Sequence, residues 1–460
     1  MTVDPINKSE IYFPSYSGSN ESLLILLNRT SKIMCKWFSD SEKLGPIPID
    51  YNFDCSVPDE NGMSADVLFS EIENLIYSSF NPVHPGSLAH LDPPPLIISI
   101  LGDLIAAGLN NNLLANELSP SISLLEESIC NWFSKKLGFP KSAGGIAASG
   151  GTLSNLNALV AARNHSGLEA DPMAVYLISE DAHSSFAKCT RIMGLGKNNL
   201  IKVKTDNNGC MDIIDLKKSI DKCSKEGKRI FSIVATLGTT IRGAIDPIER
   251  ISRICKERNI WLHIDGSIGG IFSIINSPVN GISNVNLANS ITINPQKILG
   301  ITKTSSILIV SNIEILKNTF STGLPYVSAE NNVLNRGELG IQGSRPAEII
   351  KLWLGLRFLG MKGIATVLNS SIERRIFFEN NLNPEKYDLY SGPLHIITFL
   401  PKGMNKNETD EWTLNKRISL MSKNFMLSRP LFKNRYFLRA VMGNYNTGES
   451  HINDLLKLLN

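Results

Sequence analysis

Cysteine is scarce in this chain and is never arranged as a cross-link or a metal site. The seven cysteines among 460 residues are scattered, odd in number and without a C-x-x-C spacing. This argues against a disulfide framework or a structural zinc site, and it favours a reducing, cytoplasmic location. We therefore expect no metal.

Net charge and long apolar runs are also lacking. The formal net charge of +3 gives no reason to expect a nucleic acid or an anionic membrane as partner. Residues 1–20 have no basic start followed by an apolar run, so we expect no signal peptide. The longest apolar stretch, 96–109, is too short for a bilayer and contains Asp103. Hydrophobic residues make up 42% and charged residues 19%, which is typical of a globular enzyme.

Helical patterns alternate with short β-rich runs from residue 96 to about 310. We expect strands at 175–179, 200–203, 231–236, 261–264, 290–293 and 305–310. Strand and helix in turn predict βαβ units and a mostly parallel sheet, hence an α/β fold. Sheets of this kind bind ligands at the carboxyl ends of their strands.

Three regions are expected along the chain. Residues 1–83 form a helical amino-terminal segment, with apolar residues at helical spacing over 21–38 and 65–80 and with Ser64 as an N-cap. Residues 84–372 form a large α/β domain that holds the ligand. Residues 373–460 form a smaller α+β domain.

Two motifs in the α/β region suit a phosphate and a planar ring. "SGGT", at 149–152, precedes a helix whose bare N–H groups and dipole favour a phosphate, although it also matches a plain turn and N-cap. His183, in "DAHSS", follows a strand. It either stacks on a planar ring or is satisfied by its neighbours.

Two further motifs supply an acid and an amine. Asp265, in "HIDGSIGG", ends a strand beside glycines, where it either meets a ligand or caps a loop. Thr236 ends another strand in "VATLGTT". Lys297 lies between the strands at 290–293 and 305–310, where an exposed charge is the plain interpretation.

In combination these motifs supply what pyridoxal phosphate requires. A lysine amine forms a Schiff base with the cofactor aldehyde, and an aspartate keeps the pyridine nitrogen protonated. A phosphate cradle and a stacking histidine complete the set. We therefore predict an enzyme that uses this cofactor.

The sequence resembles the group II pyridoxal-phosphate decarboxylases, which include glutamate, aromatic amino acid and diaminobutyrate decarboxylases. The resemblance runs from about Asn81 onward and rests on "HPGSLAHLDPPP", "LNNNLLANELSP", "SGGTLSNL", "DAHSS", "GTTIRGAIDPI", "HIDGSIGG", "NPQKILG", "GIQGSRPAEIIKLWLGLRFLG" and "FLRAVMGNYNT". It implies the aspartate-aminotransferase-like fold (fold type I). It also implies a homodimer with active sites at the subunit interface, in which the amino-terminal segment wraps the partner.

The resemblance assigns roles to individual residues. Lys297 matches the Schiff-base lysine, Asp265 the partner of the pyridine nitrogen and His183 the ring-stacking histidine. The other expected cofactor contacts are Gly151, Thr152, Thr236, Ser267, Asn294 and Gln296. Arg439 matches an arginine that binds a substrate carboxylate in several members, with a structural ion pair as the alternative. His84 is a further candidate for contact with the substrate.

Some positions depart from the family pattern. Leu153, Ser267, Gln296 and Ile298 stand where the family has Glu, Ala, His and Trp. No tyrosine lies between Val327 and Ser344, where family decarboxylases carry a proton-donating tyrosine, although Tyr326 stands just before this segment. General-acid help of that kind typically contributes ~10²–10⁴-fold in rate.

Three functions remain as hypotheses. The first is decarboxylation of an L-amino acid by a carboxy-lyase. The second is oxidative decarboxylation to an aldehyde, motivated by Gln296 and the tyrosine-free loop. The third is a cofactor-binding dimer without turnover. The sequence does not identify the amino acid.

Overall fold

A seven-stranded sheet lies at the centre of the computed structural model, which describes residues 13–16, 19–48, 57, 60, 62–323 and 334–459. In sheet order its strands are β1 (Gly144–Ala148), β7 (Ser306–Val310), β6 (Ser290–Ile293), β5 (Trp261–Gly266), β4 (Arg229–Thr236), β2 (Ala174–Ser179) and β3 (Leu200–Val203). Neighbours from β6 to β3 pair in parallel, whereas β7 is antiparallel to both β6 and β1. The expected mostly parallel α/β sheet is therefore confirmed.

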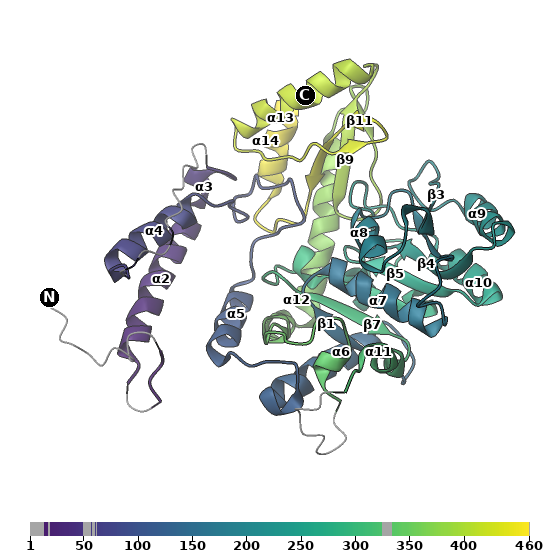
Figure 1. The fold of residues 1–460 in the computed structure, drawn as a ribbon. Coiled ribbons are helices and arrows are strands. Elements are labelled where there is room, and N and C mark those ends of the chain that lie inside the picture. The colour runs from purple at the N-terminus through teal and green to yellow at the C-terminus, as the bar shows by residue number, and fades with distance from the viewer. Residues whose placement is uncertain are drawn as a thin grey trace.

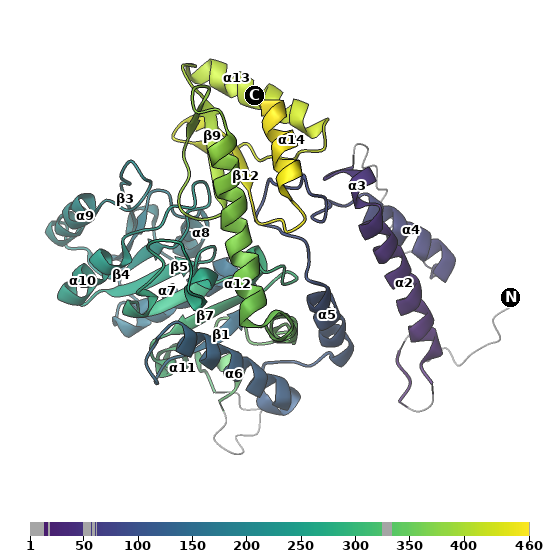
Figure 2. The ribbon, with the colours of Figure 1, turned by 180° about the vertical axis from the view of Figure 1, so that it is seen from behind.

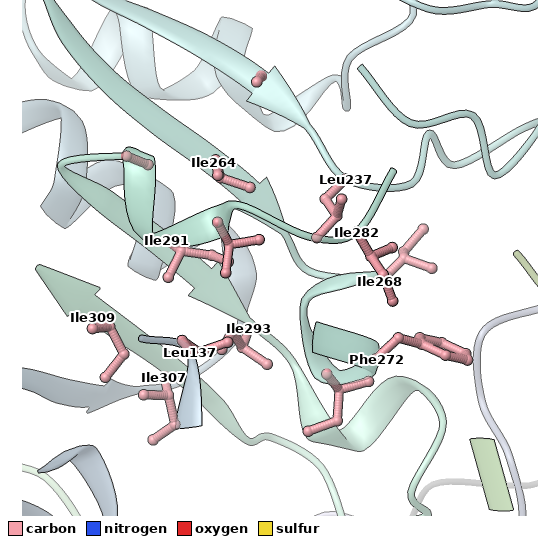
Figure 3. Close-up of a cluster of buried hydrophobic side chains, with 14 of the residues drawn as sticks. Leu137, Leu237, Ile264, Ile268, Phe272, Ile282, Ile291, Ile293, Ile307 and Ile309 are labelled. Atoms are coloured by element: carbon pink, nitrogen blue, oxygen red, sulfur yellow. The ribbon is translucent and has the colours of Figure 1, made fainter. Parts of the chain in front are cut away.

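The sheet forms because its strands are apolar on both faces. All residues of β2, β5, β6 and β7 are buried, as parallel strands covered on both sides require. The six strands expected from the sequence lie within two residues of their expected bounds, and β1 is an addition. Figure 3 shows how Ile264, Ile291, Ile293, Ile307 and Ile309 of β5, β6 and β7 build the core together.

Helices cover both faces of this sheet (Figure 1). The helices between residues 97 and 381 are α5 (Ile97–Leu109), α6 (Pro120–Lys136), α7 (Gly151–His165), α8 (Ser185–Ile192), α9 (Ile213–Lys225), α10 (Ile248–Arg258), α11 (Ile313–Phe320) and α12 (Ile349–Asn381), of which α5 packs on α12 and not on the sheet. Short 3₁₀ helices are η1 (Asn116–Leu118), η2 (Lys197–Asn199), η3 (Gly270–Ile274), η4 (Val285–Leu287), η5 (Pro295–Lys297) and η7 (Arg336–Glu338). None of the helices in the described ranges combines the length and the hydropathy needed to cross a membrane.

A second unit follows at the carboxyl-terminal end. It contains the sheet β12 (Leu438–Val441), β9 (Ile396–Pro401) and β8 (Tyr387–Leu389), the hairpin β10 (Leu431–Phe432) and β11 (Arg435–Tyr436), and the helices α13 (Lys406–Met421) and α14 (Glu449–Leu459). Phe378 and Phe399 belong to its own apolar core. Helix α12 is interrupted at Gly360, whose φ is 58°, and it crosses the expected boundary at 372/373 to join the two units.

The amino-terminal helices stand apart from this body. Figures 1 and 2 show α2 (Glu21–Ser39), α3 (Ser41–Leu44) and α4 (Ala65–Tyr77) to one side, connected to α5 by an extended segment. Ser64 caps α4 as expected, since its side chain accepts a hydrogen bond from the Val67 N–H at 3.4 Å. Apolar side chains of α2, among them Leu24 and Ile25, are exposed on this single chain.

Helix α5 packs closely on α12 through Gly102. A Cβ placed on Gly102 would lie 2.5 Å from the Lys351 Cα, whereas a Cβ on Gly108 of the same helix would have no neighbour within 4 Å. Gly102→Ala should therefore lower the free energy of unfolding by about 1–3 kcal/mol through overpacking. Gly108→Ala should raise it by about 0.5–1 kcal/mol through helix propensity. Scanning calorimetry that finds both variants shifted in the same direction would contradict this packing.

Candidate active site

Three strands end together at one edge of the sheet. Thr236 of β4 lies opposite Asp265 of β5, and Asp265 lies opposite Thr292 of β6. Directly after β6, Asn294 leads into η5, which carries Lys297. Because parallel strands present their carboxyl ends at a common edge, residues distant in the sequence meet there.

A cavity of about 200 Å³ opens at this edge, and we call it the inner cavity. Its lining includes every residue that the sequence assigned to the cofactor: Gly151, Thr152, His183, Thr236, Asp265, Ser267, Asn294, Gln296 and Lys297. Sequence reasoning missed five further lining residues, which are Asn155, Ser185, Gly238, Thr240 and Ile268. All five stand inside quoted motifs: Asn155 in "SGGTLSNL", Ser185 in "DAHSS", Gly238 and Thr240 in "GTTIRG", and Ile268 in "HIDGSIGG".

Lys297 and Asp265 place an amine and a carboxyl group at the same cavity. Burial lowers the pKa of Lys297 from its ordinary value, while Asp265 and Asp92 act in the opposite direction. The net decrease enlarges the fraction of neutral, nucleophilic amine near neutral pH. Asp265 is 5% exposed, and its Oδ1 accepts a hydrogen bond from the Ser267 N–H at 3.2 Å.

His183 directs one ring nitrogen to Ser185, the first residue of α8, and leaves the other available. Its Nδ1 accepts a hydrogen bond from the Ser185 N–H at 3.2 Å and lies 2.8 Å from the Ser185 Oγ. Partial loss of solvent lowers the pKa of His183, with Asp265 opposing and Lys297 adding to the effect. The neutral imidazole therefore carries its proton on Nε2, where it can donate.

The amino-terminal end of α7 forms a cradle for an anion. A Cβ on Gly151 would lie 2.6 Å from the Ser267 Oγ and 2.9 Å from the Asn294 Nδ2, so only glycine leaves this space open. The first N–H groups of a helix have no intrahelical acceptor and carry the positive end of the dipole. The Asn294 side chain is satisfied when its amide oxygen accepts from the Gly151 N–H at 3.1 Å and its nitrogen donates to the Ile293 carbonyl at 3.2 Å and to Ser306 Oγ at 2.7 Å. Asn294 therefore holds the first residue of the cradle in place.

Thr236 lines the inner cavity and carries a side-chain hydroxyl group. Its Oγ1 is buried and has no hydrogen-bond partner among the described residues. The backbone around it is fixed, because the Thr236 N–H donates to Asp246 at 2.7 Å, and Asp246 also accepts from the Met211 N–H at 2.6 Å. Burial raises the pKa of Asp246 to about 7. Buried hydroxyl groups are normally paired, so a molecule in the inner cavity is the natural partner for Thr236.

Gln296 is held in one orientation. Its Oε1 accepts a hydrogen bond from the Ser305 N–H, so the two N–H bonds of its amide remain as donors. Gln296 also lines the inner cavity. Gln296 therefore offers a hydrogen-bond donor that does not titrate. The family has at this position a histidine, which does titrate.

A larger cavity of about 700 Å³, the outer cavity, adjoins the inner one and shares His183 and Thr240 with it. Arg439 lines the outer cavity.

His84 lines neither cavity. Its ring is buried, its Nδ1 accepts a hydrogen bond from the Gly86 N–H at 2.9 Å, and burial lowers its pKa to about 4. Tyr326 and the first part of the tyrosine-free loop lie outside the described residues.

Comparison with known proteins identifies the family. Residues 48–389 match the model of the pyridoxal-dependent decarboxylase conserved domain. The chain belongs to the pyridoxal-dependent decarboxylase family. This decarboxylase uses pyridoxal phosphate, and the phosphate cradle, the unpaired Thr236 hydroxyl and the half-buried Lys297 amine fit that cofactor.

Individual relatives agree with this assignment. The chain is 30% identical to an acidic amino acid decarboxylase GADL1 of Xenopus tropicalis over 375 residues, which cover 76% of this chain and 72% of the relative. It is 29% identical to an aromatic-L-amino-acid decarboxylase of Bacillus atrophaeus over 322 residues, covering 69% and 67% of the two chains. The crystal structure of mouse CSAD superposes with a TM-score of 0.90 at 22% identity, covering 96% and 98%, which confirms the fold type I architecture.

Filling the cradle of this decarboxylase should weaken cofactor binding. In Gly151→Ala, the added Cβ forces Ser267 or Asn294 to move, and overpacking of this kind should raise the Kd for pyridoxal phosphate roughly 5- to 100-fold. Fluorescence titration of the apoprotein measures the change. Gly448→Ala, whose Cβ would meet only ordinary contacts at 3.7 Å and beyond, is the matched control. An unaltered Kd in Gly151→Ala would show that the phosphate lies elsewhere.

Proposed function

We propose that this enzyme decarboxylates an L-amino acid at the inner cavity, with Lys297 as the amine that attaches pyridoxal phosphate. The observation that carries the proposal is that Lys297, Asp265 and His183 line one cavity with an anion cradle. The named relatives, which act on acidic and on aromatic amino acids, support the reaction class but do not select the substrate.

Each residue has a defined task in this proposal. When bound, pyridoxal phosphate supplies an electron sink for the charge left at the substrate Cα as carbon dioxide departs. Asp265 would hold a proton at the ring nitrogen by accepting a hydrogen bond from it. His183 would pack on the ring, Thr236 would hydrogen-bond to the cofactor, and Gly151, Thr152 and Asn294 would hold the phosphate. Lys297, His183 and Asp265 are the titratable groups among the described residues that line the inner cavity.

The two alternatives receive less support. Relatives over most of the chain are named as decarboxylases, so simple decarboxylation is favoured over oxidative decarboxylation or loss of turnover. Gln296 does not oppose this choice, because its fixed amide keeps a donor where the family has histidine.

Replacement of the proposed amine tests the function directly. The parent should release carbon dioxide from an L-amino acid in a panel of acidic, basic and aromatic substrates, and Lys297→Ala should lose at least about a hundredfold in rate. Borohydride reduction followed by peptide mass analysis should find the cofactor on the peptide that contains Lys297. Lys362→Ala, which removes an exposed lysine from α12, is the control.

Two results would count against the proposal. One is cofactor attachment to a different lysine, or equal attachment in the parent and in Lys297→Ala. The other is a panel in which the cofactor-loaded parent releases no carbon dioxide at all.

We also propose a homodimer with active sites at its interface. Each chain would contribute a large domain at 84–372 and a small domain at 373–460, and its residues 1–83 would wrap around the partner subunit. Exposed apolar side chains on α5 support it: Ile97, Leu101, Leu104, Ile105 and Leu109. Helix α2 of the amino-terminal segment also exposes apolar residues.

A cytoplasmic location is proposed as well, supported by the free state of the six cysteines that the structure describes.

Charge on α5 should disrupt this dimer. Light scattering should give the mass of two chains for the parent, and Leu101→Asp combined with Ile105→Asp should shift the mass toward one chain, because buried charges without partners are costly. Ile214→Asp changes an equally apolar, exposed residue on α9 and should leave the mass unaltered. A parent with the mass of a single chain would remove the proposal.

A further inference from the structure

The outer cavity is rich in positive charge. Arg417, Arg429 and Arg439 line it, whereas Asp181 is its only acidic lining residue among those described. Asp92, which lies nearby on the segment that follows His90, is paired with Lys303. A cavity with three guanidinium groups and one carboxyl group attracts anions.

The guanidinium of Arg439 already donates three hydrogen bonds within the protein. Its Nε donates to Ser428 Oγ at 2.9 Å, its Nη1 to the Thr240 carbonyl at 2.6 Å and its Nη2 to the Ala89 carbonyl at 2.8 Å. These partners come from the carboxyl-terminal unit, the loop after β4 and the segment before α5. Burial lowers the pKa of Arg439 to about 10. Arg439 is therefore a tie between three segments, and its geometry is set by the protein.

Arg429 is committed in a similar way. Its Nε donates to Thr413 Oγ1 at 3.0 Å and its Nη2 to the Asp410 carbonyl at 2.7 Å. Its guanidinium also lies 3.6 Å from the centre of the Tyr436 ring. Two bonds and a stacked ring hold it against α13 and the β10–β11 hairpin.

Arg417 differs from both. Its Nε donates to the Leu427 carbonyl at 3.0 Å, which fixes the root of the guanidinium on α13. The two terminal nitrogens, Nη1 and Nη2, have no hydrogen-bond acceptor among the described residues, although the side chain is only partly exposed and lines the outer cavity. A guanidinium with both terminal nitrogens available is suited to bidentate binding of a carboxylate.

We propose that Arg417 binds an acidic group at the far end of the substrate side chain, so that the substrate is an amino acid with an anionic side chain. The inference rests on the proposed function, since it names the substrate class of the same site. The outer cavity adjoins the inner one at His183 and Thr240, and Leu414 and Arg417 of α13 line the outer cavity. A substrate side chain that extends from the inner cavity into the outer one therefore approaches α13. An aromatic side chain would leave the guanidinium of Arg417 without a carboxylate partner.

A pair of unreactive acids tests this binding without turnover. Glutarate and pentanoate have the same chain length, and only glutarate has a second carboxylate. Calorimetry on the cofactor-loaded protein should show tighter binding of glutarate. In Arg417→Gln this preference should fall about tenfold or more, because a charge-assisted hydrogen-bond pair is lost. The expected kinetic counterpart is a loss of kcat/KM for acidic amino acids only.

Two further variants make the result specific. Lys423→Gln removes an exposed positive charge just after α13 and should keep the full preference for glutarate. Arg417→Lys keeps the charge but loses the two-pronged geometry, so its preference should be intermediate, and it carries the test if Arg417→Gln does not fold. Absorbance of the bound cofactor and the unfolding temperature report folding in each variant.

Separate outcomes identify which idea fails. Equal affinity of the parent for the two acids, or a preference that survives in Arg417→Gln, overturns the role of Arg417. Carbon dioxide released only from aromatic or uncharged amino acids overturns it as well and leaves decarboxylation intact. A preference that depends on Arg417 in a protein without any turnover supports the anion site and overturns the proposed function instead.

Discussion

The active site depends on placing an amine and a carboxyl group at one edge of a parallel sheet, largely away from water. Asp265 occupies the register position opposite Thr236, and Lys297 follows the neighbouring strand β6. Burial alone would penalise both charged groups, and their proximity offsets part of that penalty. The balance leaves the amine with a lowered pKa beside a carboxyl group that remains available to a ligand. Strand order and register therefore determine the chemistry, because a shift of one residue would turn Asp265 to the opposite face.

Buried polar contacts fix the segments around that edge. Asp246 holds the end of β4 through the Thr236 N–H, so the loop that carries Thr240 begins from a fixed point. Elsewhere around the sheet, Glu126 of α6 binds both Arg336 and Arg345, at 3.1 and 2.9 Å. Arg345 also donates to the Ala147 carbonyl of β1, at the strand end from which the phosphate cradle starts. Removing one partner of such a buried network leaves an uncompensated charge, so these contacts keep the cradle and the strand ends in a single arrangement.

The sheet and the inner cavity were largely predictable from the sequence because both depend on local patterns. Apolar, β-branched runs such as 290–293 identify buried strands, and strand ends in a parallel sheet must meet. Hence the sequence alone was sufficient to place Asp265, Lys297 and His183 together. Thr240 and Asn155 were missed because their exposure to the cavity depends on how a loop and a helix pack. His84 was expected near the substrate, yet its ring hydrogen-bonds its own turn, a contact that no sequence pattern expresses.

The arginines of the outer cavity are a second case in which the sequence does not express the contacts of a side chain. The resemblance to the family predicts that Arg439 contacts the substrate, but it does not state which acceptors the guanidinium already has. Arg417 belongs to no motif, because its availability arises from the packing of α13 against the segment that contains Leu427. A guanidinium that is already tied to three segments gains little from a new partner, whereas one with free terminal nitrogens gains a charge-assisted pair. In the proposed site, substrate selection depends on which guanidinium the protein leaves without acceptors, and only the three-dimensional contacts identify it.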